Sequence, residues 1–277
     1  MPDPRSSHAL VFTDLDGTLL DKETYSWDKA APALSACRDA RVPVVMVSSK
    51  TRAEMVVLAR DLGLSLYPFV AENGGAVFFP ERGPLPVPPD ARPAGDGWHA
   101  WELGAPYPDL VAALREIRDA LSLSVEGFSD LSPVQIARRT GLSEEEAALA
   151  ARREYDEPFF AEEGQARRLA QAAEKKGLFV TLGGRAHHLH GNTDKGRAVA
   201  RLAALFRRAN PGVVSMGLGD GPNDVSMLRE VRVPVWLGPK DLAPDIPRLV
   251  LPPPAGPEGW NLAVSSFLRQ TVARSFG

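Results

Sequence analysis

The chain has 277 residues, of which 44% are hydrophobic and 24% charged, and its formal net charge at pH 7 is −3. This composition is typical of a globular protein and argues against a nucleic-acid-binding surface, while the length favours two domains. No apolar run approaches the roughly 18 residues of a membrane span, and no signal-like segment opens the chain, so we expect a cytoplasmic protein. The single cysteine, Cys37, excludes an internal disulfide.

The first third of the chain alternates predicted strands with predicted helices, which indicates a parallel sheet with crossover helices. Thr51 and Glu54 have the spacing of a capping box at the start of the second helix, and Gly63 can end that helix in a left-handed cap. Residues 69–79 read as two strands joined by an Asn-Gly turn. The expected strands before this hairpin are 9–13 and 43–47, and the expected helices are 28–40 and 51–62.

The middle of the chain has a different pattern. Residues 80–97 are so rich in proline and glycine that we predict an irregular connection into a second domain. The elements that follow fit two or three helices on one face of a small, largely antiparallel sheet, and Ser143 with Glu146 forms a second capping-box pattern. The expected helices are 108–121, 144–153 and 165–176, and the expected strands lie near 124–128, 178–182 and 186–190.

From residue 194 the alternation of the first part resumes, so the chain leaves its core and returns to it. We expect a helix through about 208, a strand at 213–218, a helix ending near 229 and a strand at 234–238. The predicted fold class is α/β, with a doubly wound, mainly parallel Rossmann-like core sheet and an inserted α/β cap domain. The predicted core is 1–82 with 192–277, and the predicted cap is 83–191.

Carboxylates follow two of the predicted core strands. Asp14 and Asp16 come directly after the first strand, and Gly17 lets the chain turn at once, so that both can face one cavity. Asp220 and Asp224 leave a different strand in the sequence GDGPND. Because the carboxyl ends of parallel strands share one edge, these side chains should converge there. Close carboxylates repel each other unless a cation neutralises them, and Mg²⁺ prefers oxygen ligands, so we predict a magnesium site with Asp220 as a further ligand.

The sequence also predicts a phosphate-binding site at the same edge. Ser48 and Ser49 lie where the second strand runs into a helix start, and unpaired N–H groups and the helix dipole favour an anion there. The alternative is that residues 48–51 only cap the helix. Lys195 opens another helix, where a cation is unfavourable unless an anion lies nearby.

The order of these motifs, DLDGT, a strand-terminal serine, a lysine and GDGPND, resembles the haloacid dehalogenase superfamily of aspartyl-phosphate phosphatases. The resemblance implies that Asp14 attacks phosphorus to form a phospho-aspartate. It implies that Asp16 is the general acid toward the leaving group and then the base toward water. Ser48 and Lys195 would hold phosphoryl oxygens, and Ser49 would join them in binding phosphate.

The same resemblance implies a metal-binding arrangement. Mg²⁺ would be bound by Asp14, the backbone carbonyl of Asp16, and Asp220, and it would screen charge so that one anion can attack another. Asn223 and Asp224 would orient water molecules on the metal.

The predicted cap carries a narrower resemblance. Residues 140–159 and 182–199 are similar to mannosyl-3-phosphoglycerate phosphatases, which implies release of phosphate from mannosyl-3-phosphoglycerate to give the compatible solute mannosylglycerate. Arginine suits the carboxylate of that substrate, and side-chain carboxylates or amides suit its hydroxyls. Lys50, after the two serines, stands where many sugar-phosphate phosphatases have arginine, so bidentate geometry is lost there. The cap candidates are Gln135, Arg138, Arg153, Glu157, Gly184, Arg185 and His188.

Several alternatives remain open at this point. The chain could be a phosphatase for another sugar phosphate, such as sucrose or trehalose phosphate, or a phosphomannomutase. A non-enzymatic sugar-phosphate sensor is disfavoured by the complete set of acidic residues and lysine. His188 and His190 would share one strand face and could be read as zinc ligands, but no obvious third ligand accompanies them. The expected partner is a small phosphorylated sugar-glycerate molecule, with no nucleic acid and no membrane, and both a monomer and a homodimer are compatible with the sequence.

Overall fold

The structure of the protein is a computed structural model that describes residues 8–183, 186–252 and 254–272. Its central sheet consists of β1 (Ala9–Thr13), β2 (Val44–Met46), β11 (Val214–Gly219) and β12 (Val233–Trp236). The strands lie in the order β12-β11-β1-β2, and all neighbouring pairs run parallel. Every residue of β1 is buried, as expected for a strand that is covered on both faces.

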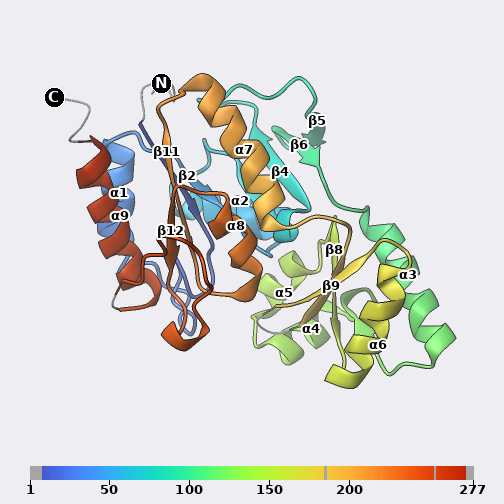
Figure 1. The fold of residues 1–277 in the computed structure, drawn as a ribbon. Helices are drawn as coiled ribbons and strands as arrows, with labels where there is room; N and C mark the ends of the chain where they lie inside the picture. The colour runs from blue at the N-terminus through green and yellow to red at the C-terminus, as the bar shows by residue number, and fades with distance from the viewer. Residues whose placement is uncertain (1–7, 184–185, 253, 273–277) are drawn as a thin grey trace.

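Helices cover both faces of this sheet, namely α1 (Ala31–Asp39), α2 (Arg52–Asp61), α7 (Lys195–Ala209), α8 (Val225–Arg229) and α9 (Gly256–Val272). Val11 of β1 shares one hydrophobic core with α1, α2 and α9, whereas its neighbour Phe12 shares a second core with α7 and α8. Alternate side chains of one strand thus face two helix layers, which lie on opposite sides of the sheet (Figure 1). The predicted doubly wound α/β core is confirmed.

An antiparallel sheet extends the central one. It contains β3 (Phe69–Ala71), β4 (Ala76–Pro80), β5 (Arg92–Gly95) and β6 (Trp98–Glu102) in the order β3-β4-β6-β5. The two sheets are joined by a parallel bridge between Val47 and Val70. The predicted hairpin over 69–79 is confirmed.

The prediction of an irregular segment at 80–97 is wrong over β5. Asp96 and Gly97 both have positive φ, at 52° and 78°, and this turn folds β6 back onto β5. Trp98 then packs on Phe69, with ring centroids 4.9 Å apart. The burial of Trp98 after the turn stabilises the pairing of β5 with β6, although the segment before the turn is rich in proline and glycine.

The central sheet and its antiparallel extension are continuous, and a separate sheet, called the second sheet below, is made of β7 (Glu126–Gly127), β8 (Asp156–Phe160), β9 (Phe179–Leu182) and β10 (His187–His190). It is antiparallel in the order β7-β8-β10-β9. The helices around it are α3 (Tyr107–Leu121), α4 (Pro133–Thr140), α5 (Glu144–Ala150) and α6 (Glu163–Glu174). Phe159 packs with α3 and α6, while its neighbour Phe160 packs against the α4 and α5 cluster. The predicted small antiparallel sheet is confirmed, but the prediction that the helices lie on one face is wrong, because α3 and α6 cover one face while α4 and α5 pack on the other.

Some elements of the structure are absent from the sequence prediction. Helix α4 begins with a capping box between Ser132 and Gln135 and ends at Gly141 in the left-handed region. The sequence therefore contains both the start signal and the stop signal of this helix. The sequence prediction also omits β8, and it extends α5 to 153, whereas the helix ends at Ala150.

Helix α9, which follows the proline-rich stretch near the end of the chain, and strand β6 are also absent from the sequence prediction. Trp260 of α9 is completely buried, and the indole Nε1–H donates to Thr13 Oγ1 at 2.9 Å, at the end of β1. Among the described residues, no helix combines the length and the apolar character needed to cross a membrane.

Candidate active site

The first strand delivers an aspartate to the carboxyl edge of the central sheet. The Asp14 N–H donates to the carbonyl oxygen of Leu218 at 2.9 Å, so the residue is fixed by the end of the β1–β11 pairing. The chain then turns at Gly17, which has φ +80°. A Cβ atom on Gly17 would lie 2.5 Å from Asp220 Oδ2, so glycine is required both by the backbone angle and by the space. Together these features place the two aspartate-bearing loops in contact.

Lys195 joins these loops from the start of α7. Its Nζ lies 2.6 Å from Asp14 Oδ1 and 2.6 Å from Asp224 Oδ1, and the residue is 1% exposed. Burial alone would lower the pKa of Lys195, but the two carboxylates raise it above its ordinary value, so the lysine is charged. The other oxygen of Asp224 accepts the N–H groups of Asp220 and Gly221 at 3.0 Å each, which holds the GDGPND loop in shape.

Three carboxylates face one another around this lysine. Ligand oxygens of Asp14, Asp220 and Asp224 all lie within 4.8 Å of one another. Burial, with Asp224 as a further cause, raises the pKa of Asp14 well above its usual range, and the same two causes raise that of Asp220 to about 6. One lysine does not balance three carboxylates, so the cluster fits a divalent cation with a preference for oxygen ligands.

Asp16 lies outside this cluster. Its Oδ2 is 3.0 Å from Lys50 Nζ, and its Oδ1 is buried without a hydrogen-bond partner. Burial would lower the pKa of Lys50, but Asp16 and Glu54 raise it, so this lysine is charged too. The two aspartates of DLDGT therefore have different cationic partners, Lys195 for the first and Lys50 for the second.

The two serines after β2 are placed differently. Ser48 is buried, its hydroxyl oxygen accepts the Lys50 N–H at 3.2 Å, and its carbonyl oxygen accepts the Asn73 N–H at 3.0 Å. Ser49 lines the cavity described below, and its carbonyl oxygen accepts from Arg153 Nη1 at 2.8 Å. The serine loop is thus anchored both to the β3–β4 turn and to the segment between α5 and β8.

A cavity of about 480 Å³ lies between the carboxyl edge of the central sheet and the second sheet, and its size suits a small molecule. Arg153 and His188, two of the predicted cap residues, line it. Burial would lower the pKa of Arg153, but Asp156 and Glu72 raise it, so one wall carries a permanent positive charge. The residues that line it from the central-sheet side include Asp14, Asp16, Ser49, Lys50, Asp220 and Asn223.

Other predicted cap residues lie elsewhere. Gln135, whose Oε1 accepts from the N–H and hydroxyl of Ser132, serves as a helix cap and does not line the cavity. Arg138 is exposed and does not line it either. Glu157 is fully buried in β8, where Oε1 accepts the Ser129 N–H at 3.0 Å. Gly184 and Arg185 lie outside the described residues.

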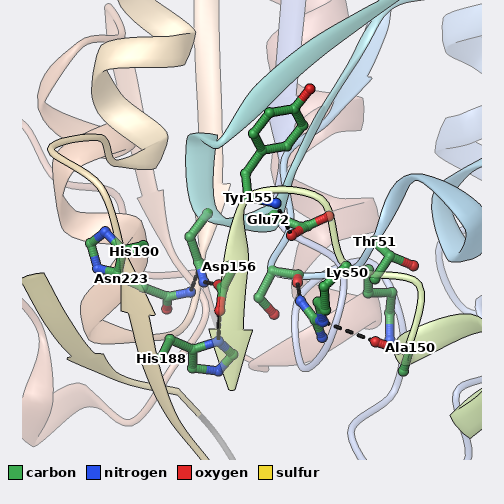
Figure 2. A network of polar contacts seen from close by, with 12 residues as sticks. Lys50, Thr51, Glu72, Ala150, Tyr155, Asp156, His188, His190 and Asn223 are labelled. Carbon is green, nitrogen blue, oxygen red and sulfur yellow. Dashed lines mark hydrogen bonds and ion pairs between the residues drawn. The ribbon is translucent and has the colours of Figure 1, made fainter. Parts of the chain in front are cut away.

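Sequence reasoning missed the partner of His188. Its Nδ1 lies 2.9 Å from Asp156 Oδ1, and Asp156 is completely buried (Figure 2). Burial would raise the pKa of Asp156, but His188 lowers it to about 2, so Asp156 is ionised and accepts the Nδ1–H. Among the described residues, the one group of three or more close metal-ligating side chains is the aspartate cluster, and neither His188 nor His190 belongs to it. A lone aspartate on an unpredicted strand gave no signal in the sequence.

The chain is similar to a known class of enzymes. The family model of haloacid dehalogenase-like hydrolases matches residues 11–84, which contain the DLDGT motif and the serine loop. A solved haloacid dehalogenase-like hydrolase from Bacteroides thetaiotaomicron has the same fold, with a TM-score of 0.65 at 15% identity, over 94% of this chain and 100% of that one.

Curated relatives match nearly the whole chain. A protein of Methanococcoides burtonii is 36% identical over 266 residues and one of Persephonella marina is 37% identical over 270, each covering 94% of this chain and 97% of the relative. Both bear the name glucosyl-3-phosphoglycerate/mannosyl-3-phosphoglycerate phosphatase. The chain therefore belongs to the haloacid dehalogenase-like hydrolases.

Proposed function

We propose that the protein is a Mg²⁺-dependent phosphatase that hydrolyses mannosyl-3-phosphoglycerate to mannosylglycerate and phosphate. The observation that carries the proposal is the buried lysine that bonds both Asp14 and Asp224, because Asp14 lines a cavity whose other wall holds Arg153 and His188. The names of the two curated relatives support this substrate class.

In the proposed reaction Asp14 is the nucleophile. Lys195 holds Oδ1 at 2.6 Å, so Oδ2 is the oxygen free to attack phosphorus. Asp16 gives a proton to the departing alkoxide and later takes one from the water that hydrolyses the phospho-aspartate. Ser48, Ser49 and Lys195 hold the phosphoryl oxygens.

The aspartate cluster is proposed to hold Mg²⁺ through Asp14 and Asp220, with the backbone carbonyl of Asp16. When bound, the ion screens the charge between the carboxylate and the phosphate and fixes their orientation. Asn223 and Asp224 are proposed to orient water on the ion. Asp224 also holds Lys195 and the GDGPND loop in place, because its carboxylate accepts hydrogen bonds from Lys195 and from two N–H groups of the loop.

The second sheet and its helices are proposed to form the specificity cap. Arg153, fixed by bonds to the carbonyl oxygens of Ala150 and Ser49, presents positive charge toward the cavity, which suits the glycerate carboxylate. Since β5 and β6 pair with β4, the boundary that we propose between core and cap lies after residue 102 instead of residue 82. The second boundary stays at residue 192, and we propose a cytoplasmic location for the enzyme.

A substrate panel tests the function. Purified protein with Mg²⁺ is incubated with mannosyl-3-phosphoglycerate, glucosyl-3-phosphoglycerate, sucrose phosphate, trehalose phosphate and a hexose 1-phosphate, and free phosphate is measured. We expect the highest kcat/KM with the two glycerate-bearing compounds. Equal values for sugar phosphates without glycerate would contradict the substrate assignment, and isomerisation of the hexose phosphate without phosphate release would indicate a mutase. EDTA should abolish the activity, and Mg²⁺ should restore it.

A further inference from the structure

We propose that Asn73 is a positioning residue that ties His188, in the substrate cavity, to Asn223, in the loop that carries Asp220. The inference deepens the proposed function and depends on it in one respect, because it takes His188 to face the substrate. Asn73 itself does not line the cavity, and it acts through Asp156.

A continuous row of hydrogen bonds carries the proposal. Asn223 Nδ2 donates to Asn73 Oδ1 at 3.1 Å, Asn73 Nδ2 donates to Asp156 Oδ2 at 3.1 Å, and Asp156 accepts from His188 Nδ1. Asn73, Asp156 and His188 are 6%, 0% and 7% exposed, so water competes little for these bonds. The row crosses from Asn223 in the core to Asp156 and His188 in the second sheet (Figure 2). Its two ends, Asn223 and His188, both line the cavity.

The charge of Asp156 sets the direction of every bond in the row. An ionised carboxylate only accepts, so Asn73 must turn its amide NH₂ toward Asp156 and its carbonyl oxygen toward Asn223. Asn223 must then donate its own NH₂ to Asn73, which leaves Oδ1 on the side of Gly221, next to the aspartate loop. At the other end, His188 keeps its hydrogen on Nδ1 and faces the cavity with Nε2. Inverting the amide of Asn73 would break two of these bonds, and inverting that of Asn223 would break one.

The backbone around Asn73 is equally constrained. Asn73 has φ 55° and ψ 31°, a left-handed conformation that asparagine tolerates better than most residues. Its N–H donates to Ser48 O, and a Cβ on the next residue, Gly74, would lie 2.2 Å from the carbonyl oxygen of Asp194. The turn therefore touches the serine loop and the start of α7 as well as the second sheet. Asn73 holds the cavity walls at a fixed distance, which a substrate that spans both walls requires.

The test compares a substrate that spans the cavity with one that does not. Asn73→Gly keeps the left-handed conformation and removes both side-chain bonds, and Asn73→Asp keeps the shape but sets a second carboxylate against Asp156. We expect each to raise KM for mannosyl-3-phosphoglycerate about tenfold, since buried hydrogen bonds to a charged group are lost. For p-nitrophenyl phosphate, which needs only the core, kcat/KM should change less than twofold. Ser122→Gly, at another left-handed position, is the matched control and should alter neither.

Two further readouts separate positioning from general damage. In a double-mutant cycle, Asn73→Gly should add less than twofold to the KM of His188→Ala, because both act on the same contact. The ¹⁵N NMR signals of the His188 ring should show hydrogen on Nδ1 in the wild-type enzyme and should move in Asn73→Asp. Equal losses on both substrates, additive effects in the cycle, or unmoved signals would each overturn the proposal. If the wild-type protein releases no phosphate from mannosyl-3-phosphoglycerate, the proposed function fails, while the NMR result still decides the role of Asn73.

Discussion

Replacing Glu72 by glutamine should change how the stability of the protein depends on pH. Glu72 is 1% exposed, in the turn between β3 and β4, and has a positive φ of 50°. Its carboxylate accepts the N–H of Glu154 at 3.0 Å and that of Tyr155 at 2.8 Å, so it fastens the core to the chain that enters β8 (Figure 2). Burial is the main cause that raises its pKa from 4.5 to about 8, with Asp156 adding to it.

Proton linkage gives the direction in which the free energy of unfolding changes with pH. Between pH 4.5 and 8 the folded protein binds more protons at Glu72 than the unfolded chain does, so the free energy of unfolding falls as the pH rises. At about 1.4 kcal/mol per pH unit, the loss from Glu72 between pH 4.5 and 7.5 is about 4 kcal/mol. Glutamine has no proton to lose, and its carbonyl oxygen can accept at the position of Oε2.

Urea unfolding of the wild type and of Glu72→Gln at pH 5, 6, 7 and 7.5 measures this difference. The free energy of unfolding of the variant, relative to the wild type, should rise steadily with pH and gain about 3 kcal/mol from pH 5 to pH 7.5. Glu230→Gln, at an exposed glutamate, is the control and should show no such trend. Parallel pH profiles for the wild type and Glu72→Gln would refute the reasoning.

Three other substitutions test the site and its support. Asp14→Asn should lower kcat about a thousandfold or more while the fold is kept, and appreciable residual hydrolysis would remove Asp14 from the nucleophile role. Gly17→Ala should raise the Mg²⁺ concentration needed for half activity, because its Cβ would displace the Asp220 carboxylate, whereas Gly164→Ala, with no atom within 4 Å of its Cβ, should leave it unchanged. Thr51→Ala should cost about 1–2 kcal/mol in urea unfolding, because the cap of α2 is lost, while Thr51→Ser should restore most of it; equal losses would mean that the hydroxyl is not the cause.

The local signals in the sequence were sufficient for most of the core. The capping boxes at Thr51 and Ser143 are present in the structure, and so are the parallel strands that carry Asp14 and the GDGPND loop. These features depend on neighbouring residues, whose spacing a sequence displays directly. The errors occurred where distant residues decide the outcome, as for β5, which forms because the segment after it folds back onto β4.

The candidate site shows the same difference between features set by local signals and features set by distant residues. Asp14 and Lys195 were identified from the ends of their elements, and the structure brings them to 2.6 Å from each other. Among the cap residues, Arg153 and His188 line the cavity, but Glu157 is buried in β8. On a strand, neighbouring residues face opposite sides, so a one-residue difference separates a cavity residue from a core residue, and the missed strand removed that information.

The order of residues along the chain is enough to indicate the kind of chemistry, because the carboxylates, the serines and the lysine stand at predictable ends of strands and helices, and parallel strands bring such ends together. The surroundings of these residues depend on the folded chain. The bonds from Asn73 to Asp156 and from Asp156 to His188 join residues 83 and 32 positions apart. No periodicity or spacing encodes such pairs. The first arises where the β3–β4 turn packs against β8, and the second where β8 pairs with β10, so both form only when the chain is folded.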